Sequence, residues 1–140
     1  MVTPQLFSSI PKSDPLNFGI GKNFKPIKVK DFLQLNKEQI SHLADVKVSS
    51  VRFDDTTPTA VREQLEAISV TCNMVAEAFD GDIEKTALWF RTKNPMLGDV
   101  SPRDMIRLRR FDRLRKFIVG AMADRAATAR GKGVLAETTA

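Results

Sequence analysis

The stretch of sequence that decides the fold is WFRTKNPMLGDVSPRD, which covers residues 89–104. It contains an Asn-Pro pair that begins at Asn94 and a glycine at Gly98, and both features stop a preceding helix. A new helix is predicted to begin at Pro102, because proline suits the first helical position and the hydroxyl of Ser101 can accept from the backbone amides there. The stretch therefore predicts a helix, a rigid turn and a capped helix.

The longest regular pattern lies upstream of this turn and predicts one amphipathic helix that begins at Thr57 and Pro58. Apolar residues recur there at alternating spacings of four and three. They are Val61, Leu65, Ile68, Cys72, Val75 and Phe79. We expect this helix to connect the two halves of an all-α chain, and the alternative is a helix paired across a dimer axis. Cys72 is expected to be a buried structural thiol.

The region before the long helix has the spacing of a helix-turn-helix unit. A short helix is predicted around Val29, and a second helix begins after Asn36, whose side chain and that of Gln39 can form a reciprocal cap. A turn follows at Asp45, and a third short helix is predicted over residues 48–53. The small core shared by these helices is expected to contain Ile40, Leu43, Val46 and Val51.

The remaining segments are an arm, a second helical region and a tail. Residues 1–26 are rich in proline and glycine, so we expect an irregular arm whose apolar residues pack on its own domain or on a partner. After residue 102 an apolar side continues and is predicted to divide into two helices near residues 109–112. It contains Met105, Leu108, Phe111, Leu114, Phe117, Ile118 and Met122. Residues 126–140 have little to bury and are expected to be flexible.

The positive charge of the chain is concentrated in one segment. The formal net charge is +5, and residues 103–116 hold seven basic residues against two acidic ones, so the rest of the chain balances at fifteen of each sign. This excess indicates an anionic partner or an acidic protein surface. The alternative is an exposed helix face whose arginines are merely solvated.

The inventory of reactive side chains argues against an enzyme. His42 is the single histidine and Cys72 the single cysteine, so neither a zinc cluster nor a disulfide framework is expected. The Gly19–Lys22 stretch lacks the spacing of a phosphate-binding loop. We expect no cofactor and no metal. The chain also shows neither a signal peptide nor a membrane-spanning run, so a cytoplasmic location is expected.

The order of these patterns resembles the Xre/MbcA/ParS-like antitoxins. The likeness covers roughly the last third of the chain and depends on Trp89, Leu97, Gly98 and the helix over residues 117–122, while residues 35–52 resemble an Xre-type helix-turn-helix unit. The resemblance implies a helix-turn-helix domain with a connecting helix (27–79) and a toxin-binding helical domain (80–125), and the composition adds a Pro-rich arm (1–26) and a flexible tail (126–140).

The resemblance also implies a function. Such a protein is a type II antitoxin that binds and occludes a cognate RES-type toxin, which degrades NAD, and that represses its own operon as a homodimer on operator DNA. Carried over by position, the toxin-binding residues are Trp89, Asn94, Leu97, Pro102, Arg107 and Arg110. From the residues alone, Trp89 is expected to be a core residue rather than a surface aromatic.

The DNA-binding residues implied by the resemblance lie at the start of the third helix of the unit. They are Lys47, Ser49, Ser50 and Arg52. Arginine can bond guanine, lysine neutralises phosphate and serine bonds either. The chain departs from the family where Ser41 replaces alanine and Asp45 replaces glycine, so a distorted turn is expected. It departs again at Arg109, where the family has glycine, so a shallow or absent bend is expected.

Two other functions are compatible with the sequence. One is a stand-alone helix-turn-helix transcriptional regulator whose C-terminal domain only dimerises. The other is a structural interaction module without DNA contact, which would follow if the turn at Asp45 has degenerated.

Overall fold

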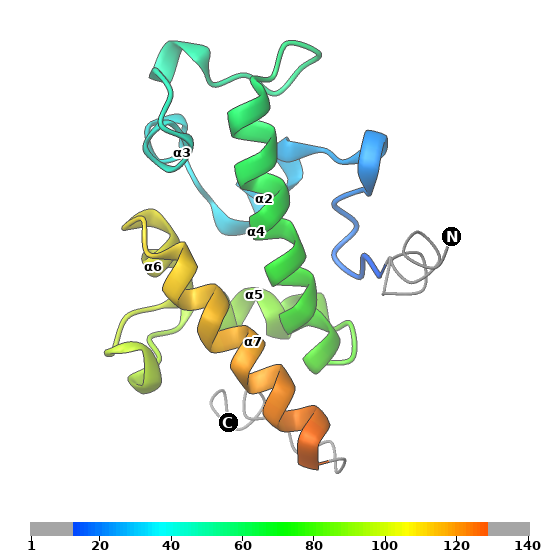
Figure 1. Ribbon diagram of the computed structural model, residues 1–140. Helices are drawn as coiled ribbons and strands as arrows, with labels where there is room; N and C mark the ends of the chain where they lie inside the picture. Colours follow the sequence, from blue (N-terminus) through cyan, green and yellow to red (C-terminus); the bar gives the residue numbers. More distant parts are fainter. Residues whose placement is uncertain (1–12, 129–140) are drawn as a thin grey trace.

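The chain folds as an all-α protein, as its sequence predicts (Figure 1). The structure is a computed structural model that describes residues 13–128, with side chains up to Arg125. Its helices are α2 (Pro26–Leu33), α3 (Lys37–Ala44), α4 (Thr59–Ala78), α5 (Ile83–Arg91), α6 (Pro102–Arg107) and α7 (Phe111–Thr128). Single 3-10 turns form at η1 (Gly21–Asn23), η2 (Val48–Ser50) and η3 (Pro95–Leu97). Between residues 13 and 128 no strand forms, apart from an isolated bridge that joins Asn94 and Val100.

Helix α4 is the central element of the molecule and confirms the long amphipathic helix predicted from the sequence. It packs against α2, α3, α5 and α7, and Figure 1 shows it running through the middle of the fold. Five of the six residues of its predicted stripe are fully buried, and Phe79 is half-buried at the C-terminal cap. Burial of such a stripe is what stabilises a helix of this length in water.

The short helices begin where the sequence provides capping residues. Pro26 occupies the first turn of α2, and the side chain of Asn36 accepts from the backbone amide of Gln39 at the start of α3, with Gln39 bonding back to Asn36. Asp82 caps α5 by accepting from the backbone amide of Lys85 at 3.0 Å. These local bonds satisfy amides that the first turn of a helix leaves without partners.

The described part of the N-terminal arm packs against α4. Leu16, Phe18 and Phe24 are buried, and the carboxylate of Asp14 accepts from the side-chain amide of Asn73 in α4 at 3.0 Å. The backbone amide of Leu16 donates in turn to the side-chain oxygen of Asn73 at 3.1 Å. The arm is therefore irregular, as predicted, and fixed to the long helix along this stretch. Residues 1–12 of the predicted arm lie outside the described residues.

One hydrophobic core spans both predicted modules. Buried residues on either side of residue 79, such as Ile40 of α3, Phe90 of α5 and Ile118 of α7, belong to the same cluster. The two halves therefore share one interior instead of meeting through a linker.

The C-terminal end of the fold differs from the prediction in one respect. Helix α7 continues to Thr128, so the first three residues of the predicted flexible tail, 126–128, are helical. The rest of that tail, residues 129–140, lies outside the described residues. Within the described range, no helix is long and apolar enough to cross a membrane.

Candidate functional site

The turn between α5 and α6 is held together by hydrogen bonds around Asn94. Its side-chain oxygen accepts from the amide of Met96 at 2.9 Å, and its own amide donates to the carbonyl of Val100 at 3.1 Å. Its carbonyl accepts from the amides of Leu97 at 2.9 Å and Asp99 at 3.0 Å. The loop is thus closed on one buried residue, which confirms the rigid turn predicted from the sequence.

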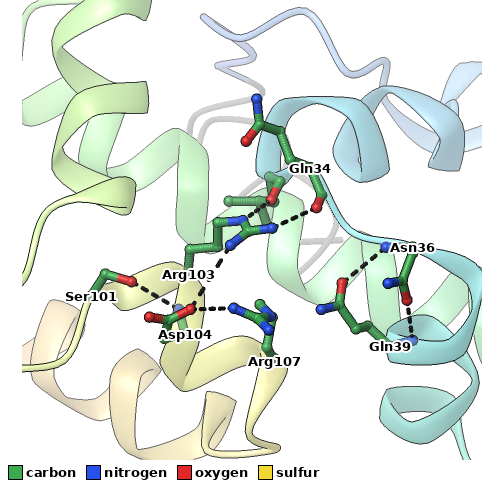
Figure 2. Close-up of polar contacts among 8 residues, drawn as sticks. Gln34, Asn36, Gln39, Ser101, Arg103, Asp104 and Arg107 are labelled. Carbon is green, nitrogen blue, oxygen red and sulfur yellow. Dashed lines mark hydrogen bonds and ion pairs between the residues drawn. The ribbon is translucent and has the colours of Figure 1, made fainter.

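Helix α6 begins and ends with defined polar contacts (Figure 2). The hydroxyl of Ser101 accepts from the backbone amide of Asp104 at 3.1 Å, with Pro102 in the first turn, as predicted. The carboxylate of Asp104 then accepts from Nη1 of Arg107 at 2.6 Å. An acidic residue in the first turn and a basic one in the last turn also suit the helix dipole.

The chain bends between α6 and α7 at a residue in the left-handed conformation. Arg109 has a φ of +62°, and the amides of Arg109 and Arg110 donate to the carbonyls of Ile106 and Met105. The helix is therefore interrupted here, so the expectation of an absent bend is wrong. Hydrogen bonds of this kind close a helix even where a non-glycine residue takes the left-handed conformation, at a cost of roughly 1–2 kcal/mol.

Three of the six predicted toxin-binding residues are buried in the structure of the chain alone. Trp89 is 2% exposed, Asn94 is 4% exposed, and Pro102 is also buried. The ring of Trp89 packs edge-on against that of Phe90, with centroids 5.1 Å apart. These three side chains shape the loop and α6 from inside, and their contact with a partner stays a prediction. The expectation that Trp89 is a core residue is confirmed.

The other three predicted residues reach the surface. Leu97 is half-buried in the loop, whereas Arg107 and Arg110 are exposed at the end of α6 and just beyond it. They lie near two apolar residues in the sequence that the prediction did not include: Met96, which is 58% exposed, and Leu108, which is 57% exposed. We call these five residues, Met96, Leu97, Arg107, Leu108 and Arg110, the partner surface.

Sequence periodicity placed Leu108 on the buried side of a continuing helix, and this is wrong. Helix α6 ends at Arg107, so Leu108 lies outside the helix and the helical periodicity no longer decides whether its side chain is buried. No local signal marked this helix end, because arginine favours helices and the left-handed conformation of Arg109 is not a preference of its residue type.

The basic segment divides into one internal arginine and an exposed group. Arg103 donates to backbone carbonyls of the N-terminal half, at Leu33 and Gln34. Its burial is the largest cause that lowers the pKa of Arg103, followed by the positive charge of Arg107. The exposed members are Arg107, Arg109, Arg110, Arg113, Arg115 and Lys116.

The predicted helix-turn-helix region forms its turn. Ser41 is buried and its hydroxyl donates to the carbonyl of Val46, and Asp45 takes the left-handed conformation with a φ of +56°. The amide of Val46 donates to the carbonyl of Ser41 at 3.1 Å, which closes the end of α3. Aspartate tolerates this conformation better than most residues, so both departures from the family pattern are accommodated.

The third helix predicted over residues 48–53 does not form. The chain makes the single turn η2, and Val51 is then extended and buried. Lys47 precedes η2 without a side-chain capping bond, and serine and β-branched residues are weak helix formers. The predicted DNA-binding residues therefore lie on a turn and an extended segment. Lys47, Ser49 and Arg52 are exposed, and Ser50 is half-buried.

Reactive side chains do not gather at either region. Cys72 is buried in α4, and burial raises the pKa of its thiol far above the usual range, so the nucleophilic thiolate is not populated at neutral pH. A hydrogen bond from the Thr56 side chain lowers the pKa of Asp54, which serves a surface turn. Across the part of the chain that the structure describes, no three His, Cys, Asp or Glu residues are grouped to hold a metal ion.

The sequence and the fold were compared with known proteins. No protein-family model matches the chain, and searches of curated proteins and of solved structures give no significant match.

Proposed function

We propose that this protein is an antitoxin that binds a cognate RES-type, NAD-degrading toxin in the cytoplasm through the partner surface. The resemblance of residues 89–104 to the toxin-binding domain of Xre/MbcA/ParS-like antitoxins supports this proposal. The single observation that carries it is the exposure of an apolar side chain at each end of α6, Met96 in the loop before the helix and Leu108 directly after Arg107, on a support closed by hydrogen bonds.

The size of α6 favours a single interface. Six helical residues span about 9 Å at 1.5 Å per residue, so the loop before α6 and the bend after it fit within one protein contact of about 800 Å² per partner. Arginine and methionine are enriched in such interfaces. An apolar contact at Leu108 would supply affinity, and Arg107 and Arg110 would select an acidic surface.

The rigidity of the support also favours binding. The loop is closed on Asn94, and α6 is capped by Ser101, so little conformational entropy is lost when a partner orders this surface. By the resemblance, the bound chain would lie over the cofactor entrance of the toxin and block NAD. Neutralisation by occlusion needs no catalytic group in the antitoxin.

The test is to co-express this chain with the protein encoded by the neighbouring gene, purify the complex and measure NAD loss. We expect co-purification and inhibition. Leu108→Glu should weaken binding at least about tenfold, because it places a charge in an apolar contact. Val70→Glu is the matched control, since Val70 on α4 is also 57% exposed, and it should change binding less than about twofold. Failure to recover a toxin, or a toxin that stays fully active in the complex, would contradict the proposal.

A second candidate role is operator binding by a homodimer, through Lys47, Ser49, Ser50 and Arg52. The exposure of Lys47 and Arg52 beside a well-formed turn favours it. With η2 in place of a recognition helix, base contacts must come from a turn, so we expect weak binding dominated by phosphates. Shift assays on upstream DNA across a salt series, with wild type and Arg52→Gln, measure this. An unchanged affinity in Arg52→Gln would remove Arg52 from the interface.

The same assays address the regulator alternative, in which the C-terminal half only dimerises. A stand-alone regulator must prefer operator DNA over other DNA when no toxin is present. In such a protein Leu108→Glu should change the oligomeric state and not toxin binding. Sedimentation measures the oligomeric state of Leu108→Glu and Arg52→Gln. Together with the shift assays, it distinguishes the antitoxin from the stand-alone regulator.

A further inference from the structure

The C-terminal end of α2 lies at the junction between the two halves of the molecule. Gln34 takes the left-handed conformation there with a φ of +55°, and the amides of Gln34 and Leu35 donate back to the carbonyls of Asp31 and Lys30. The carbonyls of the final helical turn otherwise have no partner within the helix. Those of Phe32, Leu33 and Gln34 need donors from elsewhere.

Two arginines from the other half of the chain supply these donors. Arg103 of α6 donates from Nε to the carbonyl of Leu33 and from Nη2 to that of Gln34, the latter at 2.7 Å (Figure 2). Arg91, the last residue of α5, donates from Nη2 to the carbonyl of Phe32 at 3.3 Å. The end of α2 is thus capped by residues that lie about 60–70 positions further along the chain, and positive charge at a helix C-terminus is favourable.

Figure 2 also shows why Arg103 is not part of the outward basic group. Its guanidinium reaches toward Gln34, while Asp104 is bonded to Arg107 on the neighbouring side of α6. The contact between Arg103 Nη1 and Asp104 is longer, at 3.8 Å. Arg103 is therefore directed to α2, and Asp104 keeps Arg107 in place.

Aromatic rings tie the same junction together. Phe32 of α2 packs edge-on against Phe18 of the arm, with centroids 5.7 Å apart, and against Phe90 of α5 at 6.0 Å. Phe90 in turn contacts Trp89 at 5.1 Å. The end of α2 is therefore linked to α5 by a hydrogen bond and by edge-on ring contacts, and to α6 by the forked guanidinium of Arg103.

We infer that Arg91 and Arg103 are positioning residues that join α2 to α5 and α6, so that the partner surface keeps its shape only while the N-terminal half is folded. The effect of this contact on toxin binding rests on the proposed function. The contact between α2 and the helices α5 and α6 does not depend on it.

Helix length supports this dependence. Helix α6 has six residues and α2 has eight, whereas isolated helices shorter than about 12–15 residues are marginal in water. Each must be held by tertiary contacts, and Arg103 is a direct polar contact between them. Loosening one helix is therefore expected to loosen the other, even though they lie far apart in the sequence.

The test is amide hydrogen exchange on the full chain, which needs no partner. In Arg103→Gln, the amides of residues 33–35 at the end of α2 and of residues 105–108 at the end of α6 should exchange at least about tenfold faster than in wild type. The reason is that the charge-assisted hydrogen bonds between the two helices are lost. Arg103→Lys keeps the charge but not the fork, so it should recover part of the protection. Arg115→Gln, which removes the same charge from an exposed position of α7, should leave both segments at the wild-type rate.

Two outcomes would overturn the inference. One is wild-type exchange in both segments of Arg103→Gln, and the other is faster exchange in only one of the two segments. If Arg103→Gln does not fold, Arg91→Gln, which removes one weaker bond, provides the corresponding comparison between the end of α2 and the end of α5. A protected, wild-type pattern together with loss of toxin binding would refute the positioning role while leaving the proposed function standing. If both segments exchange faster in Arg103→Gln but the wild-type protein binds no toxin, the positioning role stands and the proposed function is refuted.

Discussion

The chain contains two helix-turn segments that look alike in sequence and fold differently. Residues 36–52 and residues 94–107 each contain a capping asparagine, a left-handed residue and a short apolar segment after the turn. The second segment continues into helix α6. The first ends in the single turn η2.

The difference comes from the residue at the start of the second helix. Ser101 accepts from the amide of Asp104 and is followed by Pro102, which is preorganised for the first turn. Lys47 makes no side-chain capping bond, and the residues after it favour turns and extended chain. The cap at Ser101 is thus the difference between the segment that forms helix α6 and the segment that forms only the turn η2.

The largest expected effect concerns Trp89, which belongs to the interior of the second segment. Trp89→Ala should destabilise the protein by roughly 3–5 kcal/mol, because it leaves a large cavity. Trp89→Phe should cost much less, since the indole Nε1 is buried and has no hydrogen-bond partner among the described residues. Urea unfolding followed by circular dichroism measures both. A stable Trp89→Ala that loses toxin binding would instead make Trp89 a contact residue.

The two capping asparagines give the next comparison. Asn94 is buried, so Asn94→Ala leaves the amide of Met96 unpaired and should cost about 1–3 kcal/mol. Asn36 is exposed and water can replace its cap, so Asn36→Ala should cost about 1 kcal/mol or less. Thermal unfolding of the pair checks the order. If Asn36→Ala lost as much stability as Asn94→Ala, or more, the cap at Asn94 would not be the more stabilising of the two.

Exchanging the helix starts should narrow the difference between the segments. Ser101→Ala should lose about 0.5–2 kcal/mol. Lys47→Ser supplies the missing cap and should add helical signal within residues 48–53, measured by carbon chemical shifts. If Lys47→Ser leaves these residues in η2, then the cap does not decide the outcome, and burial of Val51 does.

The smallest effects are expected at the left-handed residues. Arg109→Gly relieves a strained conformation and should stabilise the fold by about 0.5–1 kcal/mol, after the added freedom of the unfolded chain is subtracted. Asp45→Gly should change stability by only a few tenths of a kcal/mol, because aspartate already tolerates this conformation. Chemical denaturation resolves the two. A destabilised Arg109→Gly would indicate that the arginine side chain itself holds the bend.

Much of the fold could be predicted from local chemistry. The stripe of α4, the reciprocal cap of α3 and the Ser101-Pro102 start follow from rules that act over a few residues, and each is present. The division near residues 109–112 was predicted, but the left-handed conformation of Arg109 was not, because arginine has no local preference for that conformation.

The candidate site was less predictable because exposure depends on tertiary packing. The motif predicted a site at the loop between α5 and α6, and the structure places Asn94 and Pro102 in the interior and Leu108 at the surface. The role of Arg103 had no local signal, since its acceptors lie about 70 residues earlier in the chain. In the sequence it looks like any other member of the basic segment.

The most direct measurement compares two double variants that remove the same charge, one from each segment. Calorimetric titration of the neighbouring toxin with Arg107→Gln/Arg110→Gln should show affinity reduced by at least about tenfold, as expected for arginines in an interface. Lys47→Gln/Arg52→Gln should bind within about twofold of wild type, as expected for charges outside it. Equal losses in the two variants, or a larger loss in the second, would contradict the assignment of partner binding to the surface around α6.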